Sequence, residues 1–148
     1  MTSFIFSQWF DLGMDAKKII EQALLLEPND WSGWATLGGY NWQSKAYEKA
    51  TEQLRTARSL AVDRKSQVSC EFLLADCMLE TGALDEAERL LKRLWFEDDY
   101  SAAAARLVNL LRRKGQQQKA GEVLNDALRR FPTDADLLGE KAYAALSR

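Results

Sequence analysis

The stretch 120-AGEVLNDALRRFP-132 decides the fold of this 148-residue chain. Apolar residues recur along it at spacings of three and four, from Ala120 through Leu124 to Phe131, and Pro132 ends the pattern. Such spacing places the apolar side chains on one face of an α-helix. A proline stops a helix because it has no backbone N–H to donate. The stretch therefore predicts a helix over 117–130 with one buried face.

The same apolar stripe occurs three more times along the chain. The alanines that lead the four stripes lie 34, 37 and 33 residues apart, and they are Ala16, Ala50, Ala87 and Ala120. A leucine stands thirteen residues before each of the last three alanines, and these leucines are Leu37, Leu74 and Leu107. Four copies at a nearly constant period predict a series of repeated helix pairs.

A helix-turn-helix unit of about 34 residues is characteristic of the tetratricopeptide repeat, and the sequence resembles that family. The residues that carry the resemblance most fully are Trp34, Leu37, Gly38, Ala50, Leu54 and Ala57. The resemblance implies an all-α fold, a right-handed α-solenoid of stacked helix-turn-helix repeats. In such a fold each helix pair buries its apolar residues only by stacking on its neighbours.

We expect one domain over 1–148, built from these repeats. Full repeats are expected at 31–64, 68–100 and 101–134, with a short insertion at 65–67. A partial first repeat would occupy 1–30, and 135–148 would form a capping helix that shields the last repeat from water. Nine helices are expected, near 3–11, 14–26, 31–42, 45–61, 66–80, 84–97, 101–114, 117–130 and 134–147.

The composition excludes much of the commonest catalytic and metal-binding chemistry. The chain has no histidine, which removes Ser-His-Asp and Cys-His catalysis and histidine metal ligands. Cys70 and Cys77 are too few to form a zinc site. They are seven residues apart on one predicted helix, so their Cα atoms would lie about 10 Å apart, too far for a disulfide. Packing inside the helix, rather than redox sensing, is their expected role. Without a phosphate-binding loop, calcium loop or nucleophile elbow, we expect no enzyme, no catalytic residue, no metal and no cofactor.

Charge and hydropathy bear on the partner and the compartment. The formal net charge is −2, whereas a nucleic-acid-binding surface should be basic, so no nucleic-acid partner is expected. No stretch reaches the roughly 20 apolar residues of a membrane span. The first basic residue is Lys17, so the apolar start lacks the charged lead of a secretory signal. We therefore expect a cytoplasmic protein.

The function is then expected from the surface of the protein. The resemblance implies a non-enzymatic protein–protein interaction module that holds a partner segment in its concave groove. The groove residues that it implies are Trp42, Phe72, Asp76, Leu79, Asn109, Arg112 and Arg113. The aromatic and leucine side chains would form an apolar floor, and the two arginines would bind an anionic group. Alternatively, the arginines complement the dipole at the end of their own helix.

Two functions remain open at this point. The first is an adaptor or secretion-type chaperone whose groove binds a partner segment. The second is a self-assembling structural unit, or a fragment of a longer array. The start of the chain favours a homo-oligomer, since five large apolar residues fall within ten, namely Phe4, Ile5, Phe6, Trp9 and Phe10. We expect a homotypic contact here or packing on an upstream chain, and folding back over the first helix pair is the alternative.

Overall fold

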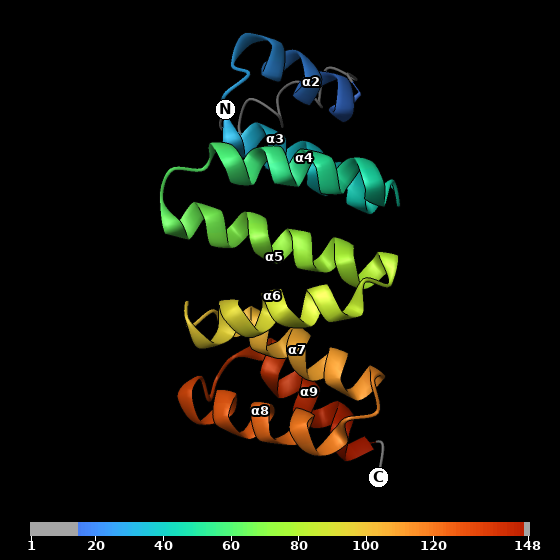
Figure 1. The fold of residues 1–148 in the computed structure, drawn as a ribbon, viewed down its shortest axis with the longest axis vertical. Helices are drawn as coiled ribbons and strands as arrows, with labels where there is room; N and C mark the ends of the chain where they lie inside the picture. The colour runs from blue at the N-terminus through green and yellow to red at the C-terminus, as the bar shows by residue number, and fades with distance from the viewer. Residues whose placement is uncertain (1–14, 147–148) are drawn as a thin grey trace. The chain divides into compact units, whose positions relative to one another are not determined.

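The computed structural model describes residues 15–146, and within this range every regular element is an α-helix. The helices are α2 (Ala16–Leu26), α3 (Trp31–Gln43), α4 (Tyr47–Leu60), α5 (Arg64–Thr81), α6 (Leu84–Phe96), α7 (Ser101–Arg113), α8 (Gln117–Arg130) and α9 (Ala135–Leu146) (Figure 1). Their bounds agree with the predicted helices to within two residues at either end. The helix predicted near 3–11 lies outside the described residues.

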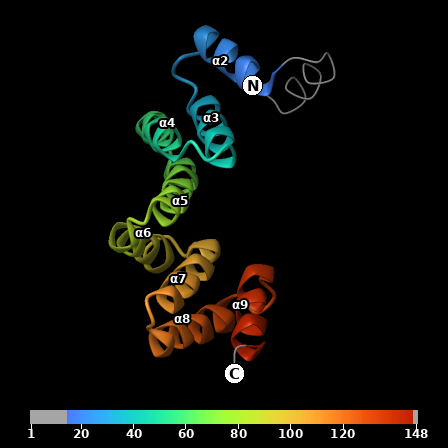
Figure 2. The same ribbon diagram turned by 90° about the vertical axis from the view of Figure 1, so that its right-hand side faces the viewer.

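The helices form two compact units, Met1–Thr81 and Gly82–Arg148. In the first unit α3 packs on α2 and on α4, and α4 packs on α5. In the second unit α7 packs on α6, α8 and α9, and α8 also packs on α9 (Figure 2). The boundary between the units falls between α5 and α6, inside the repeat predicted at 68–100.

Small residues set how closely neighbouring helices approach. A Cβ atom built on Gly38 of α3 would lie 2.7 Å from the Cγ atom of Leu54 on α4, so the two helices touch at this point. The alanines that lead the stripes are buried as well, with Ala50 and Ala87 at 0% exposure and Ala120 at 1%. The predicted stripes are therefore the buried faces of α4, α6 and α8.

The turns inside the helix pairs use a left-handed backbone conformation. Gly82 and Gly115 have φ angles of 85° and 78°, in the region that glycine adopts without steric cost. Lys45 has a φ angle of 64° at the equivalent place between α3 and α4, where the sequence offers no glycine. The same tight turn thus occurs in all three helix pairs. It carries a steric cost only at Lys45, because lysine has a Cβ atom.

Helix α5 is longer than its counterparts because it includes the predicted insertion. It has 18 residues, whereas α3 and α7 have 13 each, and positions 65–67 lie in its first turn. The additional turn places Arg64 where its Nη1 atom lies 2.7 Å from Oε2 of Glu71, a carboxylate that is buried. Nε of Arg58 lies 3.6 Å from the other carboxylate oxygen. The N-terminal extension of α5 therefore supplies a cation to a buried charge.

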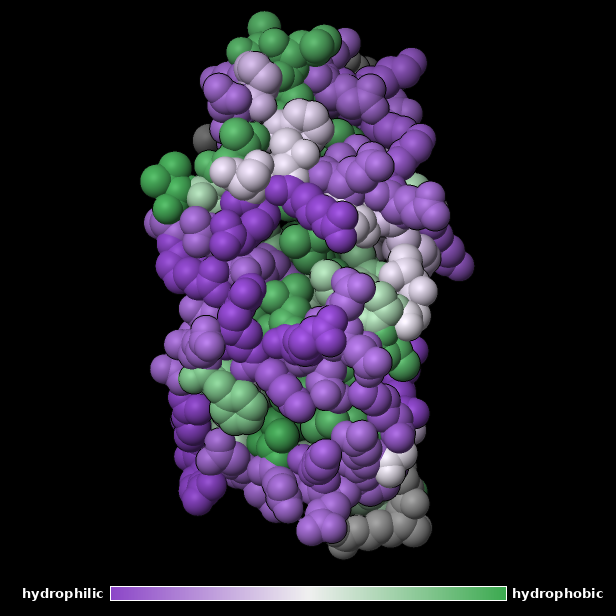
Figure 3. Space-filling model, viewed as in Figure 1, coloured by the Kyte–Doolittle hydropathy of each residue, from purple (hydrophilic) through white to green (hydrophobic). Residues whose placement is uncertain are grey.

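The outer faces of the helices are mainly hydrophilic. Figure 3 shows this on one side of the molecule, where the hydrophobic side chains form several patches, one of them over α2. Leu25 and Leu26 of α2 are exposed. Across residues 15–146, no helix combines the length and the apolar character that crossing a membrane requires.

Both cysteines are fully buried in α5 as free thiols, and the predicted packing role is confirmed. Burial raises the pKa of Cys70 and of Cys77, which keeps both thiols protonated at neutral pH. Because the thiolate is the reactive form, we expect both to react at pH 8 with a disulfide reagent such as 5,5′-dithiobis(2-nitrobenzoate) about tenfold or more slowly in the native protein than in urea. Equal rates in the two states would contradict this burial.

Candidate functional site

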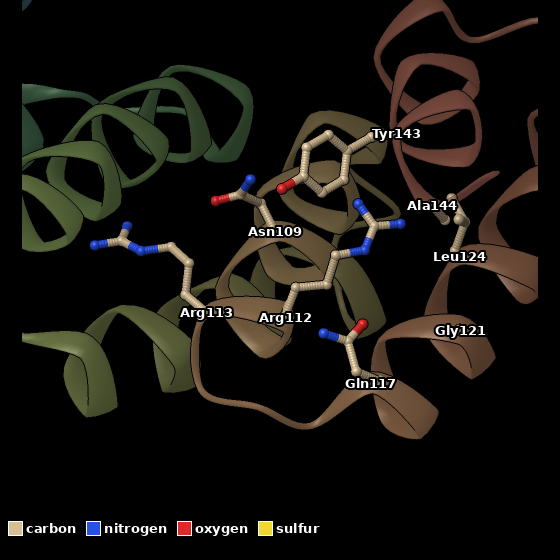
Figure 4. A pocket seen from close by; sticks show the side chains of 8 residues that line it. All are labelled: Asn109, Arg112, Arg113, Gln117, Gly121, Leu124, Tyr143 and Ala144. Atoms are coloured by element: carbon tan, nitrogen blue, oxygen red, sulfur yellow. The ribbon is translucent and has the colours of Figure 1, made fainter. Parts of the chain in front are cut away.

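The second unit contains a cavity of about 720 Å³ bordered by α7, α8 and α9. Ligand pockets in proteins commonly have volumes of about 300 to 1,000 Å³, so this one has room for several side chains. The residues that line it are Asn109, Arg112, Arg113, Gln117, Gly121, Leu124, Tyr143 and Ala144 (Figure 4). The structure therefore brings three of the predicted groove residues, those of α7, to one cavity.

Arg112 is held by α9. Its guanidinium forms an ion pair with the carboxylate of Glu140, and its Nη2 atom donates to the backbone carbonyl oxygen of Glu140 at 2.8 Å. The same guanidinium lies over the ring of Tyr143, 5.3 Å from its centroid. The Arg112 side chain is only 10% exposed, so its charge is compensated within the protein. The structure thus places the Arg112 guanidinium against Glu140, and the predicted contact of this charge with a ligand stays a prediction.

Arg113 points in the other direction. Figure 4 shows its side chain extending away from Arg112 and Tyr143. It is exposed, and within residues 15–146 it makes no hydrogen bond or ion pair. Asn109, one turn earlier on α7, and Gln117, at the start of α8, are likewise exposed and unpaired within the described range. The cavity thus has a polar rim with one available positive charge.

The opposite wall of the cavity is apolar. Gly121 and Leu124 of α8 and Ala144 of α9 form it. A Cβ atom built on Gly121 would have no other atom within 4 Å, so the space in front of this glycine is open. The site therefore combines a polar rim on one side with an open apolar wall on the other.

The first unit holds a smaller cavity of about 200 Å³. Its lining residues are Gly39, Trp42, Gln43, Leu54, Leu73 and Asp76, which include two of the predicted groove residues. The indole Nε1 atom of Trp42 is buried and has no hydrogen-bond acceptor among the residues that the structure describes. Such unsatisfied buried donors are uncommon in native proteins.

Phe72 and Leu79, the other two predicted groove residues, line neither cavity. Phe72 is half-buried, and Leu79 is 8% exposed and belongs to the core. The physical reason lies in α5, whose buried residues include Val68, Leu74 and Cys77 as well as Leu79. These positions surround the helix, so α5 is covered on more than one side. Leu79 therefore lies within the packing around α5 and not at the border of either cavity.

Sequence reasoning misses five of the residues that line the larger cavity. They are Gln117, Gly121, Leu124, Tyr143 and Ala144. The pattern assigns Leu124 only to the buried stripe of α8, and it places Tyr143 and Ala144 on a capping helix. The glycine at 121, inside an otherwise regular stripe, is the one available signal. For metals, residues 15–146 contain no group of three or more Cys, Asp or Glu side chains placed to hold an ion.

Comparison with known proteins agrees with this architecture. The family model described as tetratricopeptide repeat matches residues 101–146. Among solved structures, two of MamA superpose with TM-scores of 0.65 and 0.67 at 19% and 17% identity, covering 79% and 84% of this chain and 67% and 68% of theirs. TTC0263, a thermophilic TPR protein in Thermus thermophilus, superposes with a TM-score of 0.53 at 19% identity, covering 96% of each chain. No curated protein sequence matches this chain significantly.

The described helices form a fold of stacked helical repeats, the architecture of these neighbours. The family match over residues 101–146 and the shared fold confirm the predicted resemblance to tetratricopeptide-repeat proteins, and the fold is an α-solenoid of helical repeats. Proteins of this family are generally non-catalytic modules that bind proteins or peptides.

Proposed function

We propose that the chain is an adaptor that binds a segment of a partner protein in the cavity between α7, α8 and α9. The observation that carries this proposal is the pairing of a polar rim with an open apolar wall around one cavity. Pockets that bind with specificity commonly combine a mainly apolar lining with a few placed polar groups. The smaller cavity at Trp42 and Asp76 would provide an additional contact in the first unit.

The chemistry of the rim indicates the kind of segment that fits. Arg113 offers a positive charge to a carboxylate, and the amides of Asn109 and Gln117 can donate to or accept from a peptide backbone. The wall at Gly121 and Leu124 can bury an apolar side chain. The favoured ligand is therefore a short segment with one acidic residue beside a large apolar residue. Arg112 holds α9 in place and does not bind the ligand directly.

The decisive variant fills the cavity without harming the fold. Because a Cβ atom at position 121 meets open space, we expect Gly121→Leu to fold normally and to gain about 0.5–1 kcal/mol of stability from helix propensity. The same side chain would occupy the ligand's place, so affinity for the partner should fall at least tenfold. The partner is identified by co-purification and mass spectrometry, and its affinity is then measured by calorimetry with purified proteins.

The matched control is Asn125→Leu, which adds a leucine at an exposed position of the same helix, α8, that lines neither described cavity. Its melting temperature should not fall, and its affinity for the partner should equal that of the wild type. Arg113→Gln should weaken binding chiefly at low salt, because an exposed charge acts over a distance that ions screen. Unchanged affinity in Gly121→Leu would overturn this assignment of the site.

A homotypic contact through the N-terminal aromatic segment, the expected cytoplasmic location and the exclusion of nucleic acid remain predictions. The segment from Phe4 to Phe10 lies outside the described residues.

A further inference from the structure

The face of α9 that points away from the protein is apolar. The residues on this face, hereafter the α9 outer stripe, are Leu138, Gly139, Ala142, Ala145 and Leu146, and all of them are exposed. Leu138 is 44% exposed and Leu146 is 86% exposed. Leu137, on the opposite side of the helix, is the residue that α9 buries. At 3.6 residues per turn, no charged residue falls within the outer stripe.

The repeat register shows what normally covers such a face. Ala142 follows Val108 by 34 residues, and Val108 in turn follows Ala75 by 33 and Gly38 by 70. Gly38 is the point at which α3 touches α4, and Val108 and Ala75 are fully buried. By this register α9 is the first helix of a pair, and its outer stripe is the face that a second helix would cover.

Within the second unit, α9 has neighbours on one side only. It packs on α7 and α8, and Figure 2 shows both of them on the same side of the helix. A capping helix should present a polar outer face to water. Helix α9 covers α7 and α8, but its own outer stripe is apolar. An exposed apolar face of this kind marks a contact surface.

We propose that this surface binds a second copy of the same chain, with the two α9 helices packed antiparallel across a two-fold axis at Ala142. A two-fold contact requires a surface that is complementary to itself. The outer stripe meets this requirement because its residues are placed evenly about Ala142. Leu138 and Leu146 lie four residues to either side, and Gly139 and Ala145 lie three residues to either side.

In the antiparallel pair each residue meets its counterpart from the other copy. Leu138 of one copy packs on Leu146 of the other, so a large side chain covers a large one. Gly139 faces Ala145, and these small residues let the two helices approach closely. Among the described residues of α9, the charge nearest to the stripe is Lys141, which lies on one flank. The two-fold axis places Lys141 of the other copy on the same flank of the dimer. Repulsion between these two lysines is screened by salt, so added salt should strengthen the association.

The size of the surface sets the expected strength. A helix of 12 residues is about 18 Å long, which is too short to supply the roughly 1,200–2,000 Å² of a stable interface. The dimer should therefore be weak, and its population should depend on the protein concentration. The proposal does not rest on the cavity between α7, α8 and α9, and either one can fail without the other.

The first test is sedimentation of the full chain between 10 and 500 μM. We expect the wild type to shift from monomer toward dimer over this range. Ala142→Glu places two carboxylates at the two-fold axis and should keep the protein monomeric throughout. Gln118→Glu adds the same carboxylate to an exposed site on α8 and should dimerise as the wild type does. A monomeric wild type at 500 μM, or dimerisation of Ala142→Glu equal to that of the wild type, would overturn the proposal.

The second test establishes the antiparallel arrangement. Leu138→Cys and Leu146→Cys are prepared separately and oxidised alone or as an equal mixture. Identical positions would be about 12 Å apart along the helix axis in the antiparallel pair, beyond the reach of a disulfide, whereas unlike positions would meet. We expect cross-linked dimers from the mixture and few from either variant alone. The native thiols are buried and should not interfere. Equal cross-linking of each variant alone would exclude this geometry, and so would its absence from the mixture.

Discussion

Ala120→Glu should unfold the second unit of the chain or lower its stability by about 3–5 kcal/mol. Ala120 lies in the buried stripe of α8 and is 1% exposed, so a glutamate there has no space and no partner for its charge. A buried carboxylate without a compensating cation costs several kilocalories per mole. Because native proteins are stable by only about 5–15 kcal/mol, this single change removes a large share of the total. Urea unfolding followed by circular dichroism measures the effect.

The control for this variant is Gln118→Glu, two residues earlier on the same helix. Gln118 is exposed, and an exposed substitution of this kind usually changes stability by less than about 0.5 kcal/mol. Comparing the two variants distinguishes the effect of burying a carboxylate from the effect of adding a negative charge to α8. If the two variants unfold at the same urea concentration, the apolar face of α8 has been assigned incorrectly.

Glu71→Ala is the second change with a large expected effect, about 2–3 kcal/mol of lost stability. The Glu71 carboxylate is buried beneath Arg64, at 2.7 Å, and Arg58, at 3.6 Å. Both contacts are ion pairs, of which only the shorter is within hydrogen-bond distance, and one charge-assisted contact of this kind contributes about 1.5–3 kcal/mol. The two arginine side chains are 42% and 36% exposed, so they can turn toward water, which limits the loss. Thermal unfolding of the purified variant measures it.

Two further variants identify the origin of that loss. Glu52→Ala removes an exposed glutamate from α4 and should leave the melting temperature nearly unchanged. Arg64→Met keeps much of the volume but removes the cation that the longer α5 supplies, and it should reproduce a substantial part of the Glu71→Ala effect. A wild-type melting temperature in Arg64→Met would show that the additional turn of α5 has no electrostatic role.

The helices of this protein can be predicted because each buries one apolar stripe against its neighbour. That stripe has the period of the helix itself, as in α8, so its start and end are visible in the sequence. Asn109, Arg112 and Arg113 can be placed together for the same reason, since spacings of three and four put them on one side of α7. The local pattern is sufficient for these features.

The features that cannot be predicted depend on contacts between distant residues. The pairing of Arg112 with Glu140 joins positions 28 apart, and no local spacing indicates it. The burial of Leu79 is not visible in the sequence, because α5 is covered on more than one side and its apolar residues do not mark a single face. An exposed apolar stripe has the same residue spacing as a buried one. The sequence alone therefore does not show that the outer stripe of α9 is exposed.

The packing of each helix on its near neighbours in the chain also governs how fast the protein can fold. Every strong contact between described helices joins elements that are adjacent or one apart in sequence, such as α3 with α4 or α7 with α9. Native contacts therefore close short loops, and little chain entropy is lost before they form. Proteins with such local topology fold in microseconds to milliseconds. Nascent chains of this kind can begin to fold before synthesis is complete, since α3 and α4 need nothing from the C-terminal helices to meet.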